Sequence, residues 1–119
     1  MTIAIDTSEL KKVRIRVDDG KKIKRIKFAI YADAALPRLI EILDGRKPKT
    51  IGVVAGPGAF SATRTGVALA NALAYGWNIP IVALSQAQFD SPDPLPPGAL
   101  PPVAVRYATP PNITKKKTA

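Results

Sequence analysis

Asp6 is the first residue whose type and position could support chemistry, because it directly follows a short apolar run, Thr2 to Ile5, that is typical of a β-strand. A carboxylate at the end of a strand could hold a metal ion, but metal-dependent nuclease chemistry needs several converging carboxylates around two ions. The apolar run Thr50 to Ala55 offers no further carboxylate. We therefore interpret Asp6 as an acceptor of hydrogen bonds at a turn with Thr7 and Ser8, and we predict no catalytic residue and no metal site.

The composition excludes further classes of enzyme. The 119 residues include no histidine and no cysteine. A Ser-His-Asp triad, a thiol nucleophile, a disulfide and a zinc site built on imidazole or thiolate are therefore excluded. The N-terminus lacks the pattern of a signal peptide, and no apolar stretch approaches the roughly 20 residues that span a bilayer. We expect a cytoplasmic protein that uses no cofactor and has no membrane contact.

A glycine-rich motif, Gly56-Pro57-Gly58, stands between a predicted buried strand and a predicted helix. Such a motif could cradle phosphate through the exposed N–H groups of a helix N-terminus. It lacks the lysine and the spacing of a P-loop. We interpret it as a tight turn that redirects the chain, with Ser61 or Thr63 as the cap of the following helix.

A basic hairpin dominates the first part of the chain. The whole chain has 18 Lys and Arg against nine Asp and Glu, and a net charge of +9. Alternating apolar and basic residues from Lys11 to Val17 predict a half-buried strand, Asp18-Asp19-Gly20 predicts a turn, and Lys22 to Tyr31 predicts the returning strand. The hairpin could attract RNA phosphates. Alternatively, its lysines protect a solvated sheet edge from aggregation. The residues that would contact RNA are Arg14, Arg16, Lys22 and Lys24.

Two helices are predicted in the middle of the chain, one from Asp33 to Gly45 and one from Ala62 to Trp77. The first has two apolar stripes, and the second is apolar nearly all round, so both need burial on more than one side. Either the helices pack on each other and on the sheet, or a partner covers the remainder. The interface residues that we predict are Ala35, Leu39, Ile42, Arg64, Gly66, Ala70 and Leu73.

The organisation changes near Asp90, because eight of the 12 prolines lie between Pro92 and Pro111. Proline lacks an N–H donor and fixes φ, so this stretch cannot form a helix or a central strand. We predict a compact domain over residues 1–89, an extended and mostly solvated linker over residues 90–102 and a basic tail over residues 103–119. The tail includes one short strand-like piece, Val103 to Tyr107.

The predicted order β-β-β-α-β-α-β resembles a single lobe of the ribonuclease-H-like α/β fold, shared by actin and the Hsp70 ATPase domain. That fold has a mixed sheet with helices on its faces. The first three strands would form an antiparallel meander, and short crossover connections favour parallel pairing of the last strands.

The stretch from Val53 to Pro80, VVAGPGAFSATRTGVALANALAYGWNIP, resembles the motif of the TsaB family, also called YeaZ or Gcp-like. The opening Ala4-Ile5-Asp6-Thr7-Ser8 and the pair Leu36-Pro37 are similar to two further family motifs. The resemblance implies a non-catalytic subunit that dimerises with the threonylcarbamoyl transferase TsaD and supports modification of the tRNA adenosine beside the anticodon. ATP and transfer chemistry would belong to that partner. A homodimer and contact of the complex with tRNA are also compatible with it.

The chain departs from the family pattern in several places. Full-length members have a second half of the same fold, where this chain has the proline-rich stretch. Tyr31-Ala32-Asp33 stands where the family has His-Ser-Glu, and Ala62 replaces a frequent glycine. We therefore expect a reduced member that retains mainly the N-terminal lobe, from which a two-lobed nucleotide cleft cannot form. The alternatives are a small basic RNA-binding module on the same half-fold and, less favoured, an ATPase or peptidase.

Overall fold

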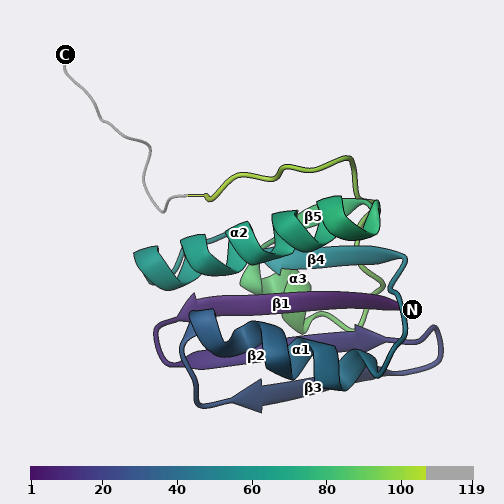
Figure 1. Cartoon of the computed structure of the whole chain (residues 1–119), viewed down its shortest axis with the longest axis horizontal. Coiled ribbons are helices and arrows are strands. Elements are labelled where there is room, and N and C mark those ends of the chain that lie inside the picture. Colours follow the sequence, from purple (N-terminus) through teal and green to yellow (C-terminus); the bar gives the residue numbers. More distant parts are fainter. Residues whose placement is uncertain (107–119) are drawn as a thin grey trace.

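The computed structural model describes residues 1–106, and the remaining residues lie outside its description. Five strands form one mixed sheet in the order β3-β2-β1-β4-β5. Helices α1 and α2 cover one face of the sheet, and α3 lies on the other (Figure 1). In chain order the elements are β1 (Thr2–Glu9), β2 (Lys12–Asp18), β3 (Ile23–Phe28), the 3-10 helix η1 (Ala32–Ala34), α1 (Ala35–Leu43), β4 (Thr50–Val54), α2 (Phe60–Trp77), β5 (Ile81–Leu84) and α3 (Gln86–Asp90).

The pairing of the strands follows the predicted order. One row of residues crosses all five strands: Ile26, Ile15, Ile5, Val53 and Ala83. The first three strands pair antiparallel, whereas β1 with β4 and β4 with β5 pair in parallel. The antiparallel meander and the parallel last strands are thus confirmed. Because side chains alternate between the two faces of a strand, each face has its own core.

The larger core lies between the sheet and the two long helices. It contains the fully buried Ile3, Ile5 and Ile15 of the meander, and Leu39 of α1 and Ala70 of α2 pack against it. A hydrogen bond of 2.7 Å from Thr7 Oγ1 to the carbonyl oxygen of Ala62 ties β1 to the start of α2.

A smaller core lies on the opposite face, under α3. Ala4, Val54, Leu84 and Phe89 are fully buried there, and Leu95 packs against them. The helix α3 begins at a capping box in which the Ser85 side chain accepts from the backbone N–H of Gln88, and the Gln88 side chain accepts from the N–H of Ser85. This short helix therefore has a locally encoded start.

The chain after α3 runs along the β5 edge of the sheet as an extended segment whose residues are exposed or half-buried. Ala99 exchanges two backbone hydrogen bonds of 2.9 Å with Ile81 of β5. Val103 then exchanges two hydrogen bonds, of 2.8 and 2.9 Å, with the amide of Asn71 on α2. Arg106 N–H donates to the carbonyl of Ala55 at 2.6 Å. We call residues 91–106 the C-terminal strap.

None of residues 91–102 is buried, but unlike a free linker this extended segment is hydrogen-bonded to the sheet edge. Proline forbids a central strand, but it does not prevent an extended segment from lying along a sheet edge. A short strand was expected at Val103 to Tyr107. Residues 103–106 form no strand, and Tyr107 and the basic end of the tail lie outside the described residues.

Some helix boundaries also differ from expectation. The predicted start at Asp33 lies in the 3-10 helix η1, and α1 itself begins at Ala35 with Ala34 as its N-cap. The helix α2 begins at Phe60 with Ala59 as N-cap, and neither Ser61 nor Thr63 caps it. Within the described part of the chain, no helix is both long and apolar enough to cross a membrane.

Candidate functional site

The outer surface of α1 carries two large apolar side chains. Leu36 is 39% exposed and Ile40 is 50% exposed. On the other flank of the helix, the guanidinium carbon of Arg38 lies 5.5 Å from the ring centroid of Phe28, the last residue of β3. That flank of α1 therefore faces β3. Leu36 and Ile40 therefore lie on the flank that faces α2.

The helix α2 carries a matching apolar flank. Asn71 and Tyr75 hydrogen-bond to Val103 and Pro101, so their flank of α2 faces the C-terminal strap. Leu69, Leu73 and Trp77 recur at every fourth position on the opposite flank, toward α1, and they are partly buried against the core.

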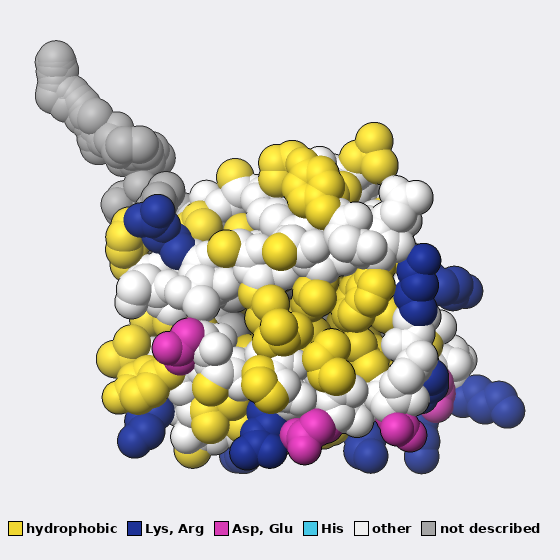
Figure 2. Space-filling model, viewed as in Figure 1, with side chains coloured by type: hydrophobic (Ala, Val, Ile, Leu, Met, Phe, Trp, Pro, Cys, Tyr) yellow, Lys and Arg dark blue, Asp and Glu magenta, His cyan; other side chains and the backbone are white. Residues whose placement is uncertain are grey.

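Together these residues form an apolar surface on one side of the molecule. Hydrophobic side chains gather between α1 and α2 in the space-filling view (Figure 2). The helix α2 packs on η1 rather than along α1, so the two helices do not cover each other's apolar flanks. A separate pocket of about 220 Å³ lies at the start of α2. Its lining includes Leu10, Tyr31, Asp33, Ser61 and Thr65. We call Leu36, Ile40, Leu69, Leu73 and Trp77 the helix-face patch.

The structure corrects four of the predicted interface residues, because they belong to the internal core. Ala35, Leu39 and Ala70 are fully buried. A Cβ atom at Gly66 would overlap with Thr7 of β1, so the missing side chain serves the approach of α2 to the sheet. These residues are therefore not accessible to a partner.

The other three predicted interface residues lie at or beside the surface. Leu73 belongs to the helix-face patch, and Ile42 is partly buried against the core. Arg64 is exposed, and its guanidinium carbon lies 5.1 Å from the ring centroid of Phe60, on the flank of α2 that faces away from α1. Leu36, Ile40, Leu69 and Trp77 of the helix-face patch are not among the predicted interface residues.

The glycine-rich turn is packed against the chain's own backbone. A Cβ atom at Gly58 would lie 2.6 Å from the Cβ of Ser8, and one at Gly56 would overlap with the carbonyl oxygen of Arg106. Gly56 has a φ of 117°, which side chains disfavour. Ala59 N–H, at the end of the turn, donates to the carbonyl of Ser8 at 2.7 Å. This arrangement supports the interpretation of Gly56-Pro57-Gly58 as a tight turn.

Asp6 is buried in β1 and satisfied by its neighbours. Its Oδ1 accepts from the N–H and the hydroxyl of Ser8, at 2.9 and 2.5 Å. Its Oδ2 accepts from Nε and Nη2 of Arg14, at 3.0 and 2.6 Å. Arg14 also pairs with Asp90 at 2.7 Å. Although burial lowers the pKa of Arg14, its hydrogen bonds to Asp6 and Asp90 and their charges raise that pKa above its ordinary value.

No group of three or more His, Cys, Asp or Glu residues suited to a metal ion occurs in residues 1–106. The two hydrogen bonds from Arg14 to the Asp6 carboxylate hold the Arg14 guanidinium in place.

Arg16 is the most unexpected residue of the structure. Its side chain is fully buried on the α3 side of the sheet. Nη1 donates to the carbonyls of Gln88, Phe89 and Ser91, at 3.1, 3.0 and 2.9 Å, and Nη2 donates to the carbonyl of Asp93. Burial and the charge of Arg25 lower the pKa of Arg16.

These contacts correct the predicted RNA role of Arg14 and Arg16. Arg16 has no surface for a phosphate, and Arg14 is held by two carboxylates. Lys22 and Lys24 are exposed, as predicted. Lys24 lies opposite Val17 and therefore on the face that bears α1 and α2, whereas Arg14 and Arg16 lie on the other face. The structure thus does not bring the four residues together.

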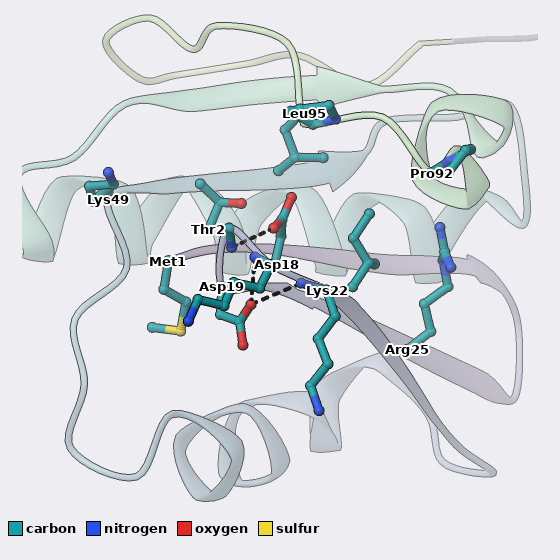
Figure 3. Close-up of a pocket in the computed structure, with 13 residues that line it drawn as sticks. Met1, Thr2, Asp18, Asp19, Lys22, Arg25, Lys49, Pro92 and Leu95 are labelled. Carbon is teal, nitrogen blue, oxygen red and sulfur yellow. Dashed lines mark hydrogen bonds between the residues drawn. The ribbon is translucent and has the colours of Figure 1, made fainter.

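A pocket of about 630 Å³ lies between the β2–β3 turn and the strap. Leu95 and Pro92 lie on the strap side, and Asp18, Lys22 and Arg25 come from the hairpin (Figure 3). The carboxylates of this turn hold its backbone: Asp18 Oδ1 accepts from Gly20 N–H at 2.9 Å, and Asp19 Oδ1 accepts from the N–H groups of Lys21 and Lys22. The hydrogen bonds from Lys21 and Lys22 lower the pKa of Asp19.

Comparison with known proteins agrees with the fold and the motifs. Residues 37–95 match the model of the TsaD family, described as tRNA N6-adenosine threonylcarbamoyltransferase. A search of curated proteins gives no match.

Two solved structures are similar. One is YeaZ from Pseudomonas aeruginosa, with a TM-score of 0.63. The other is a protein with similarity to peptidase YeaZ from Pseudomonas aeruginosa, with a TM-score of 0.64. Each is 22% identical over 75% of this chain and 48% of its own, so this chain spans about half the length of these relatives. The chain therefore resembles the TsaB (YeaZ) family, as its sequence predicts, and it has the ribonuclease-H-like α/β fold of these relatives.

Proposed function

We propose that the chain is a non-catalytic subunit that binds a TsaD-like transferase and supports threonylcarbamoylation of tRNA. The observation that carries the proposal is the helix-face patch, which leaves Leu36 and Ile40 exposed beside the apolar flank of α2. Contiguous exposed apolar surface is typical of a protein interface.

The choice of partner rests on similarity. The family model that matches residues 37–95 describes a tRNA threonylcarbamoyltransferase, and the solved relatives are YeaZ-type proteins. A transferase of the same fold would present comparable helices, and two such faces can bury their apolar flanks against each other. The occupant that we propose is therefore a helical face of a TsaD-like transferase, and a second copy of this chain would be the alternative outcome.

The non-catalytic role agrees with the chemistry of the side chains. The sequence has no histidine and no cysteine, and the one buried carboxylate of β1 is held by Arg14 and Ser8. A general acid or base must be able to reach a substrate proton, and Asp6 is closed in on all sides. The reacting groups would belong to the partner.

The proposal is tested by reconstitution with a TsaD-like transferase, the enzyme that supplies its threonylcarbamoyl donor, and an unmodified tRNA. We expect no transfer when this chain replaces the transferase, and a higher rate when the chain is added to the transferase. Transfer by the chain without the transferase would contradict the non-catalytic role. An unchanged rate, together with no co-elution of the two proteins, would contradict the subunit role.

A further inference from the structure

The two edges of the sheet differ in how they are covered. The β5 edge is occupied by the strap through the hydrogen bonds between Ile81 and Ala99. The β3 edge has only β2 as a hydrogen-bonded neighbour, and residues 1–106 place no other strand beside it. Within residues 1–106, the outer edge of β3 is therefore not paired with another strand.

The cations along this edge are lysines without carboxylate partners. Lys21, Lys22, Lys24 and Lys27 are all exposed, and none is within ion-pair distance of a carboxylate in the described part of the chain. We call these four residues the β3-edge lysines. Their arginine neighbours are engaged elsewhere, as Arg25 donates to the carbonyls of Asp90 and Ser91 at 2.9 and 2.8 Å.

The geometry of the edge spreads these charges along the length of β3, on both faces of the sheet. Lys24 lies opposite Val17 and Lys27 opposite Arg14, so these two project to opposite faces of the sheet. A strand rises about 3.3 Å per residue, so Lys22 to Lys27 spans about 17 Å. That length corresponds to about five phosphates of one nucleic-acid strand, at about 3.4 Å along the axis.

The chemistry of the edge favours phosphates over bases. Lysine ammonium groups act as point charges that neutralise phosphates and carry no bidentate base readout. The exposed edge residues Lys21, Lys22, Lys24 and Lys27 are not interleaved with exposed aromatic rings on which bases could stack. In Figure 2, Lys and Arg side chains gather along the side of the molecule where β3 lies, apart from the hydrophobic side chains between the helices.

We propose that the β3-edge lysines form a binding surface for the phosphate backbone of RNA, separate from the helix-face patch. The choice of RNA over another polyanion rests on the proposed function in tRNA modification. Because the two surfaces share no residue, the chain would hold the transferase by its helices and the RNA by its sheet edge at the same time.

The test uses the full chain and a fluorescently labelled tRNA transcript, with binding followed by fluorescence anisotropy over a series of salt concentrations. The edge variant combines Lys22→Gln, Lys24→Gln and Lys27→Gln. The matched control combines Lys11→Gln, Arg64→Gln and Arg106→Gln, which removes the same charge from exposed residues away from the β3 edge. Thermal unfolding confirms that both variants are folded.

We expect the edge variant to lose at least about tenfold in affinity at low salt, and the slope of log affinity against log salt to fall by about 2 to 3, since each lost phosphate contact removes nearly one. The control variant should keep most of the affinity and slope. Equal losses in both variants would show that net charge alone acts, and they would overturn the proposal. Unchanged binding of the edge variant, or no binding by the parent chain at low salt, would also overturn it.

A parallel titration separates this proposal from the proposed function. The edge variant should bind the transferase as tightly as the parent chain does. If the parent chain binds tRNA through the edge but does not bind the transferase, the edge surface stands and the subunit role fails. If the parent chain binds the transferase while the edge variant binds tRNA normally, the subunit role stands and the edge surface fails.

Discussion

Arg16 donates a hydrogen bond of 3.0 Å to the backbone carbonyl of Phe89, across 73 residues of sequence. The bond joins the second strand of the meander to the short helix that follows the last strand. The same guanidinium reaches further carbonyls at Ser91 and Asp93. This buried cation, together with Arg25, thereby fixes the start of the C-terminal strap against the face of the sheet opposite α1 and α2.

Replacing Arg16 should therefore destabilise the fold. In Arg16→Met, the carbonyl of Asp93 loses its donor and those of Phe89 and Ser91 keep only Arg25, so we expect a loss of about 2–4 kcal/mol in the free energy of unfolding. Urea denaturation measures it. Arg64→Met is the matched control, because Arg64 is exposed on α2, and it should change stability by less than about 1 kcal/mol. Similar values for the two variants would show that Arg16 does not hold the strap.

Gly66 and Gly76 provide a second pair of matched variants on α2. A Cβ atom at Gly66 would overlap with Thr7 Oγ1, whereas one at Gly76 would meet nothing within 4 Å. Gly66→Ala should cost about 1–3 kcal/mol through overpacking. Gly76→Ala should add about 0.5–1 kcal/mol through helix propensity. Thermal unfolding of the free chain measures both, and a neutral Gly66→Ala would contradict the close approach of α2 to Thr7.

Two hydrogen bonds between the Asn71 side chain and the Val103 backbone hold the strap against α2. Both groups of the Asn71 amide are used, so Asn71→Ala should free the strap around Val103 and cost about 1–2 kcal/mol. Amide hydrogen exchange reports this directly, because the N–H of Val103 donates to Asn71 Oδ1 and should lose its protection. Thr65→Ala, at an exposed position of the same helix, should leave that protection intact. If the Val103 amide exchanges at the same rate in Asn71→Ala and in the parent chain, Asn71 does not hold the strap.

The meander could be predicted from the sequence because its pattern is local. Val13, Ile15 and Val17 alternate with basic residues at the period of a strand, and the Asp18-Asp19-Gly20 turn lies between two such runs. Alternation, however, does not reveal what covers the second face. The carbonyls that bury Arg16 come from residues more than 70 positions away, so the pattern predicted a solvated arginine where the structure has a buried one.

The helices show a different limit of sequence patterns. In α1, Leu36 and Ile40 are larger than Ala35, so hydrophobicity places them in the core stripe. The structure turns Ala35 and Leu39 to the sheet and leaves the larger pair facing α2. When a helix has two apolar stripes, its neighbours decide which stripe faces the sheet. In α1, the contact of Arg38 with the Phe28 ring shows which flank faces β3. The two stripes thus predict an uncovered apolar flank on this helix, but they do not predict which stripe faces the sheet.

The central claim is that the helix-face patch binds a TsaD-like transferase, and isothermal titration calorimetry of the transferase with Ile40→Glu tests it most directly. A charge placed on an apolar contact loses its hydration without gaining a partner, so we expect an affinity at least about 30-fold lower, or about 2 kcal/mol. Leu100→Glu places the same charge on a side chain that is 83% exposed and outside the patch, and it should bind within about twofold of the parent chain. Parent-like affinity of Ile40→Glu, with the free chain folded, would contradict the account.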